Sequence, residues 1–285
     1  MNDNPDNGGW PATPWKESAQ AAIAWQGQRF PQVAASFAGD DADFSLADDI
    51  WRKDGTGIAD LLHYQGRFAT GMDDRTKGAH LVAFYSHQLS IAAGALYLRT
   101  GLVPDLDPAI LASRFEPYAP KNAGAGALAR PSDARRLHFR FRQFRQGRDN
   151  ASLFHDSFVA SLAPVVETVK ARTGLSSAAQ WRLAADGIAG AFLEIGTASG
   201  QEEHAMASAL ALVNTEGSPL SSSAVRYQKI VAIVGGVPVE RIFRLRSGCC
   251  LYYRTDDGTF CDVCVLLDEE TQKSRLHAHL ERTGG

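Results

Sequence analysis

Four cysteines are the residues whose type and spacing most directly indicate chemistry in this chain. Cys249, Cys250, Cys261 and Cys264 are all the cysteines of the 285-residue sequence, and their spacing is C-C-x10-C-x2-C. Four thiols so close in sequence can meet at one point. Four thiolates can hold a zinc ion or an iron–sulfur cluster. The sequence therefore predicts a metal or redox centre near the C-terminus.

The residues between the two cysteine pairs predict how the pairs meet. The segment 251–255, Leu-Tyr-Tyr-Arg-Thr, is typical of a strand, and Asp256-Asp257-Gly258 is a strong turn signal. We expect a hairpin in which Gly258 supplies a positive φ. With Thr255 opposite Thr259, Cys250 would lie opposite Cys264. The flanking Arg246 and Arg254 would either tune a cluster or pair with Asp256 and Asp262.

Spacing alone is compatible with three functions for the thiols: a structural zinc site, a redox-active dithiol or a [2Fe–2S] cluster. A structural zinc site is usually built from two C-x2–4-C pairs, which Cys249-Cys250 is not. Adjacent strand residues point to opposite faces, although Gly248 would permit the backbone to bend. A dithiol at Cys261-x-x-Cys264 would leave the other pair unexplained. A [2Fe–2S] cluster takes two thiolates on each iron, which suits two tight pairs.

Composition and the N-terminal residues indicate which partners and which cellular compartment to expect. The net charge of -3 gives no reason to expect nucleic acid as a partner. The polar start of the chain lacks the pattern of a secretory signal, and we expect no membrane span because no stretch of about 18 residues is continuously apolar. We therefore expect a cytoplasmic protein in a reducing compartment, where clustered thiols bind metal or are redox-active.

The cysteine motif also carries a family resemblance. Arg-Ser-Gly-Cys-Cys-Leu-Tyr-Tyr-Arg, followed after ten residues by Cys-x-x-Cys, resembles the C-terminal signature of the FhuF-type ferric-siderophore reductases. The resemblance covers roughly residues 244 to 266 and includes all four cysteine positions. It implies that these cysteines ligate a [2Fe–2S] cluster and that the protein reduces Fe(III) in a siderophore, releasing Fe(II). It implies no particular substrate-binding residue.

The implied reaction needs one electron and no bond breaking in the siderophore, because Fe(II) binds hard anionic oxygens far more weakly than Fe(III). No nicotinamide or flavin motif is present, so we expect a ferredoxin or flavoprotein as the electron donor. Two alternatives stay open. One is a zinc-stapled binding protein without enzymatic activity, and the other is a [2Fe–2S] electron carrier without a siderophore site.

A basic strand is the second candidate site. Residues 135–142 alternate, with Leu137, Phe139 and Phe141 on one face. The other face carries Arg136, His138, Arg140 and Arg142. A row of like charges on one strand is retained more readily when an anion lies opposite it. We expect either a surface for an anionic ferric siderophore or arginines paired with acids on neighbouring strands. The candidate substrate residues are Arg136, His138, Arg140, Arg142 and Arg145.

Periodicity predicts an α+β fold: one predominantly helical domain around a small antiparallel sheet, with a C-terminal cysteine-rich segment. The clearest helix is predicted over 76–100, ended by Gly101, with structural roles for His80 and His87. Strands are predicted over 229–234 and 237–246 around Gly235-Gly236. We divide the chain into a disordered lead-in (1–13), a mainly helical siderophore-binding region (14–240) with the basic strand near 135–145, and a cluster-binding segment (241–285).

Overall fold

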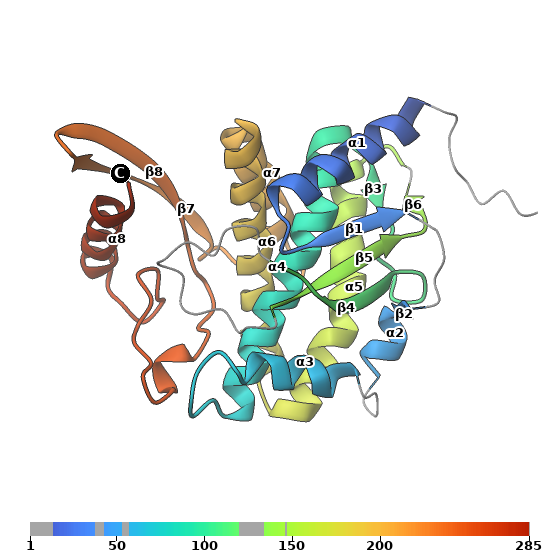
Figure 1. The fold of residues 1–285 in the computed structure, drawn as a ribbon, viewed down its shortest axis with the longest axis horizontal. Coiled ribbons are helices and arrows are strands. Elements are labelled where there is room, and N and C mark those ends of the chain that lie inside the picture. Colours follow the sequence, from blue (N-terminus) through green and yellow to red (C-terminus); the bar gives the residue numbers. More distant parts are fainter. Residues whose placement is uncertain (1–13, 38–42, 53–56, 120–133, 146, 285) are drawn as a thin grey trace, which may run out of the picture.

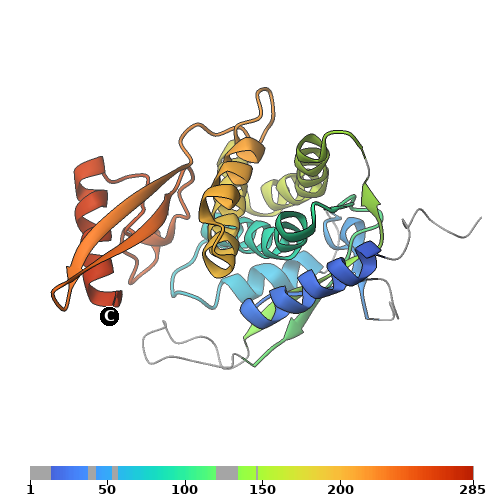
Figure 2. The ribbon, with the colours of Figure 1, turned by 90° about the horizontal axis from the view of Figure 1, so that it is seen from above.

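The structure is a computed structural model that describes residues 14–37, 43–52, 57–119, 134–145 and 147–284. The predicted lead-in at 1–13 lies outside the described residues. A body of long helices carries a small sheet on one flank, and a hairpin with the last helix projects from the opposite side (Figure 1 and Figure 2). The predicted α+β class with predominant helix is confirmed.

Helix α4, Asp74–Thr100, is the central helix of the body. Its start is capped by the carboxylate of Asp73, which accepts a hydrogen bond from the Thr76 N–H at 2.8 Å. Its end is Gly101 in the left-handed region with φ 72°, as the sequence predicts. Within the described part of the chain, α4 is the one helix long and apolar enough to cross a membrane, and 72% of its most apolar window is buried in the protein. A core helix of a soluble protein shows the same properties, so the absence of a membrane span stays a prediction.

Helix α6, Ser177–Ser199, packs closely against α4 because glycines lie at their contact. A Cβ on Gly94 would lie 2.8 Å from the Phe192 ring, and a Cβ on Gly187 would collide with the Ser86 hydroxyl. We call this closely packed pair the α4–α6 unit. The other described helices of the body are α1 Pro14–Arg29, α2 Ala47–Ile50, α3 Gly57–Gln65, α5 Asn150–Thr173 and α7 Glu202–Val213.

The sheet on the flank has the strand order β1-β5-β4-β2 and is mixed, because β1 and β5 run parallel while the other pairs are antiparallel. The alternation predicted in β5, Arg135–Phe141, is confirmed: Leu137, Phe139 and Phe141 are buried in the main core, and Arg136, His138 and Arg140 face the other way. Its neighbours are β1 Ala34–Phe37, β4 Ala112–Pro117 and β2 Ser45–Leu46, and a separate pair joins β3 Val103–Pro104 to β6 Phe144–Arg145.

The projecting hairpin consists of β7, Arg226–Val234, and β8, Val237–Leu245. Gly235 and Gly236 both have positive φ, 57° and 83°, which forms the two-residue turn that the sequence predicts. Helix α8, Glu269–Thr283, covers one face of the hairpin with a small core of its own. The boundary that the sequence analysis places between 240 and 241 lies within β8.

Candidate metal centre

The segment from Arg246 to Asp268 joins β8 to α8 and passes beside the start of α4 (Figure 1). The predicted hairpin over 251–260 is wrong. Leu251 has φ 61° and reverses the chain directly after the cysteine pair, and Tyr252–Arg254 form a 3-10 turn (η1) instead of a strand. The Cys250–Cys264 strand register therefore does not exist.

The predicted turn at Asp256-Asp257 is present. The Gly258 N–H donates to the Thr255 carbonyl at 3.0 Å. Gly258 does not have the positive φ that we expected. It is required for a different reason, because a Cβ at this position would collide with the carbonyl oxygen of Tyr252.

Cysteines of the two pairs lie near one another without a hairpin. Cys250 and Cys261 are in side-chain hydrogen-bond contact, and Cys249 lies close enough to Cys250 and Cys264 to interact electrostatically with both. The Cys264 N–H donates to the Cys261 carbonyl at 2.9 Å, which closes a tight turn around the second pair. Gln272 of α8 donates to the Cys264 carbonyl at 2.7 Å. A short reversal therefore brings the two cysteine pairs together, as the sequence analysis infers.

The surroundings favour negative charge on one sulfur, that of Cys250. A hydrogen bond from the Cys261 thiol, together with contacts from His80 and Arg246, holds the pKa of Cys250 well below its usual value. The same hydrogen bond and burial raise the pKa of Cys261. Burial raises the pKa of Cys249. The pair Cys250–Cys261 thus readily gives up one proton and holds the second tightly, unless a cation replaces it.

Two buried nitrogen donors lie beside the thiols and could donate hydrogen bonds to sulfur atoms. Arg246 Nε and His80 Nε2 are both buried; Arg246 Nε lies 3.6 Å from Asp186, beyond hydrogen-bond distance, and His80 contacts Cys250. Thiolate and sulfide sulfurs of an iron–sulfur cluster accept hydrogen bonds from such groups. Among the residues that the structure describes, no three or more His, Cys, Asp or Glu side chains converge as one metal ion requires.

The ion pairs predicted for the flanking arginines are different in the structure. Arg246 lies 3.6 Å from the buried Asp186 of α6, and Arg254 pairs with Asp73 at 3.1 Å. Asp262 lies 3.3 Å from His279 of α8. Tertiary packing brings helices to the cysteine segment, and these helices carry acids and bases that no local pattern indicates.

Sequence reasoning also assigned His80 a purely structural role, without reference to the thiols. His80 contacts Cys250, and its ring lies 6.1 Å from that of Tyr252. No sequence signal links it to a cysteine about 170 positions away. His87, two turns further along α4, pairs with Glu194 at 3.0 Å and has the structural role predicted for it.

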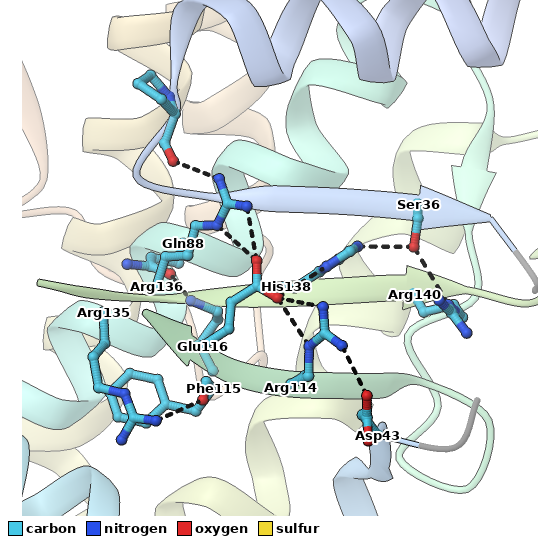
Figure 3. A network of polar contacts seen from close by, with 12 residues as sticks. Ser36, Asp43, Gln88, Arg114, Phe115, Glu116, Arg135, Arg136, His138 and Arg140 are labelled. Carbon is cyan, nitrogen blue, oxygen red and sulfur yellow. Dashed lines mark hydrogen bonds and ion pairs between the residues drawn. The ribbon is translucent and has the colours of Figure 1, made fainter. Parts of the chain in front are cut away.

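The basic strand β5 faces an acid on the neighbouring strand β4 (Figure 3). Glu116 accepts from Arg136 Nε at 2.8 Å and from Arg114 Nε at 2.9 Å, and it lies 3.5 Å from His138. Burial raises the pKa of Glu116, but the hydrogen bonds from Arg136 and Arg114 outweigh it and the pKa lies below its usual value. Burial and the two arginines lower the pKa of His138, against the opposing effect of Glu116.

The remaining candidate cations are not equivalent. Arg140 shares the face of Arg136 and His138, is only 9% exposed and lies over the Phe44 ring at 3.8 Å. Arg142 follows β5 and is half-buried. Arg145 belongs to β6, in the other small sheet, and pairs with Asp105 at 3.0 Å. The structure therefore brings three of the five predicted residues together and partly neutralises them, as the ion-pairing interpretation expects.

No model of a known protein family matches this chain, and no curated protein sequence matches it. The resemblance to the FhuF-type reductases rests on residues 244 to 266 alone, and both the family and the cluster stay predictions.

Proposed function

We propose that this protein is a cytoplasmic [2Fe–2S] enzyme that transfers one electron to Fe(III) held by a siderophore, so that Fe(II) is released. The observation that carries the proposal is the contact between cysteines of the two pairs beside two buried nitrogen donors, Arg246 Nε and His80 Nε2. When bound, the cluster would supply one electron at a time.

The residues at the thiols would have different roles in holding a [2Fe–2S] cluster. Cys249, Cys250, Cys261 and Cys264 would be its ligands. Arg246 would donate to sulfur and favour the reduced, more negative state. Cys264 is 5% exposed and would shield its side of the centre from water, whereas the other three thiols are half-buried and leave a path for electrons.

The substrate would be an anionic ferric siderophore, and the electron donor a ferredoxin or flavoprotein. The basic face of β5, with Arg136, His138 and Arg140, is the candidate docking surface for the siderophore. The pairing of Arg136 with Glu116 leaves this surface less positive than its sequence suggests. That observation favours a second candidate function, an electron carrier that has the cluster and no siderophore site.

Anaerobic purification with a visible spectrum and assays for iron, sulfide and zinc tests the centre. We expect a red-brown protein with about two irons and two sulfides per chain. The chemically reduced protein is then mixed with ferric siderophores of the carboxylate, catecholate and hydroxamate types, and Fe(II) is trapped by a ferrous chelator. Saturable oxidation of the protein with matching Fe(II) release supports the reductase.

The same experiment separates the alternatives. A colourless protein with stoichiometric zinc would remove both redox functions and leave a structural metal site. A reducible cluster that no siderophore reoxidises in a saturable way would leave the electron carrier.

A further inference from the structure

The most enclosed charged side chain at the cysteine segment belongs to helix α6. The Asp186 side chain is 3% exposed. Its carboxylate accepts hydrogen bonds from the N–H of Ser247 at 2.7 Å and of Gly248 at 2.9 Å, and the Ser247 hydroxyl lies 3.1 Å away. A buried carboxylate is stable only with such partners. Asp186 therefore ties the two residues that precede the cysteine pair to the α4–α6 unit.

Two arginines share this single carboxylate. Arg244 Nη1 lies 3.5 Å from one Asp186 oxygen and Arg246 Nε lies 3.6 Å from the other. The two guanidinium groups exceed the charge of Asp186, and the excess lies beside Cys250 and Cys261, both of which interact with Arg246. Asp186 therefore offsets part of the charge of Arg246.

We infer that Asp186 is a positioning residue of the metal centre, which holds Arg246 against the sulfur ligands and lowers the reduction potential by offsetting its positive charge. The inference rests on the proposed function and concerns how strongly the centre reduces its substrate. A hydrogen-bonded cation at the sulfurs stabilises the reduced state. A carboxylate behind that cation weakens the effect, which keeps the centre a stronger reductant.

The test is the midpoint potential, measured by redox titration of the anaerobically purified protein and followed by the visible spectrum. D186N keeps the shape of the side chain and one acceptor, and it removes the charge. We expect reduction by a fixed donor to become at least tenfold more favourable, which is about 59 mV for one electron. R246Q should shift the potential in the opposite direction, and R246K should restore most of it.

A matched control lies on the same helix. Glu194 pairs with His87 at the surface and is 49% exposed. E194Q removes a more exposed charge that, of the two arginines, acts on Arg244, so it should shift the potential much less than D186N does. In the double variant D186N/R246Q, the shift caused by D186N should be smaller than in the wild-type background, because it acts through Arg246. Equal shifts in both backgrounds would overturn the route through Arg246.

Failure of the inference and failure of the proposed function give different results. A wild-type protein without iron and sulfide removes the proposed function. A wild-type cluster whose potential is the same in D186N, with the spectrum intact, overturns the inference and leaves the function standing. If D186N does not fold, R246Q decides, since an unchanged potential in that variant removes Arg246 as the link.

Discussion

Replacing Glu116 by glutamine tests whether the Glu116 carboxylate stabilises the folded protein by pairing with the arginines around the basic strand β5. The Glu116 side chain is 12% exposed and its two oxygens accept from the guanidinium groups of Arg114 and Arg136. In E116Q an amide nitrogen replaces one carboxylate oxygen, and its N–H groups point at a guanidinium group. Hydrogen bonds to charged groups contribute about 1.5–3 kcal/mol each, so losing one face of the bridge should lower the unfolding free energy by about 2–4 kcal/mol.

Urea unfolding followed by circular dichroism measures this loss at pH 7. The matched control is E240Q, because Glu240 also pairs with a cation of a neighbouring strand, Lys229 at 3.0 Å, but is 63% exposed. An exposed pair is worth about 0.2–1 kcal/mol. If E116Q costs no more than E240Q, the bridge does not stabilise the sheet and our reading of β5 as partly neutralised is wrong.

The pH dependence of E116Q gives a second check. Because the pKa of Glu116 is lowered in the folded protein, its contribution is present above the unfolded value of about 4.5 and is lost as the pH falls through the folded value. The difference in unfolding free energy between wild type and E116Q should therefore be constant near neutral pH and shrink below about pH 4.5. A difference that persists at acid pH would refute the ionic origin.

Three further predictions concern other residues. A Cβ in G248A would lie 2.9 Å from the Leu183 nitrogen, so this variant should fold but bind less iron per chain, measured by iron assay and spectrum; full iron content would contradict the close approach. His138 has a lowered pKa in the folded protein, so its protonation destabilises the fold as the pH falls from about 6.5 to the folded value. The unfolding free energies of wild type and H138Q should therefore diverge only within that pH window. Parallel curves would show that His138 makes no pH-dependent contribution to stability. Replacing Arg140 and Arg142 with glutamine should weaken ferric-siderophore binding in a titration and leave the visible spectrum intact, and unchanged affinity would remove the basic face of β5 as the docking surface.

The sequence was a good guide where a signal is local. The turn at Gly235-Gly236 needs two positive φ angles, which glycine adopts without strain, and the strands on either side follow from it. The end of α4 at Gly101 and the alternation of β5 are of the same kind. Each depends on the conformational preference of a few adjacent residues, or on which face of one element is apolar.

The local signal was misleading at the cysteine segment itself. Residues 251–255 favour a strand, but Leu251 takes a left-handed conformation and the chain turns at once. A strand needs a partner to bond with, and this segment instead contacts the connection between α3 and α4, with the Asp256 N–H donating to the Thr70 carbonyl at 3.1 Å and Arg254 pairing with Asp73. Tertiary contacts outweighed β-propensity, which is a weak preference.

By itself the sequence determined the mainly helical α+β class and the proximity of the two cysteine pairs along the chain, because periodicity, caps and a short connecting segment are local properties. Only the tertiary structure decided what surrounds those thiols. His80 from α4 and Asp186 from α6 reach the cysteine segment across distances in sequence that no spacing rule covers. Likewise, Glu116 meets Arg136 only because β4 and β5 pair. Charge compensation depends on proximity in space, and packing of the α4–α6 unit and of the sheet creates that proximity.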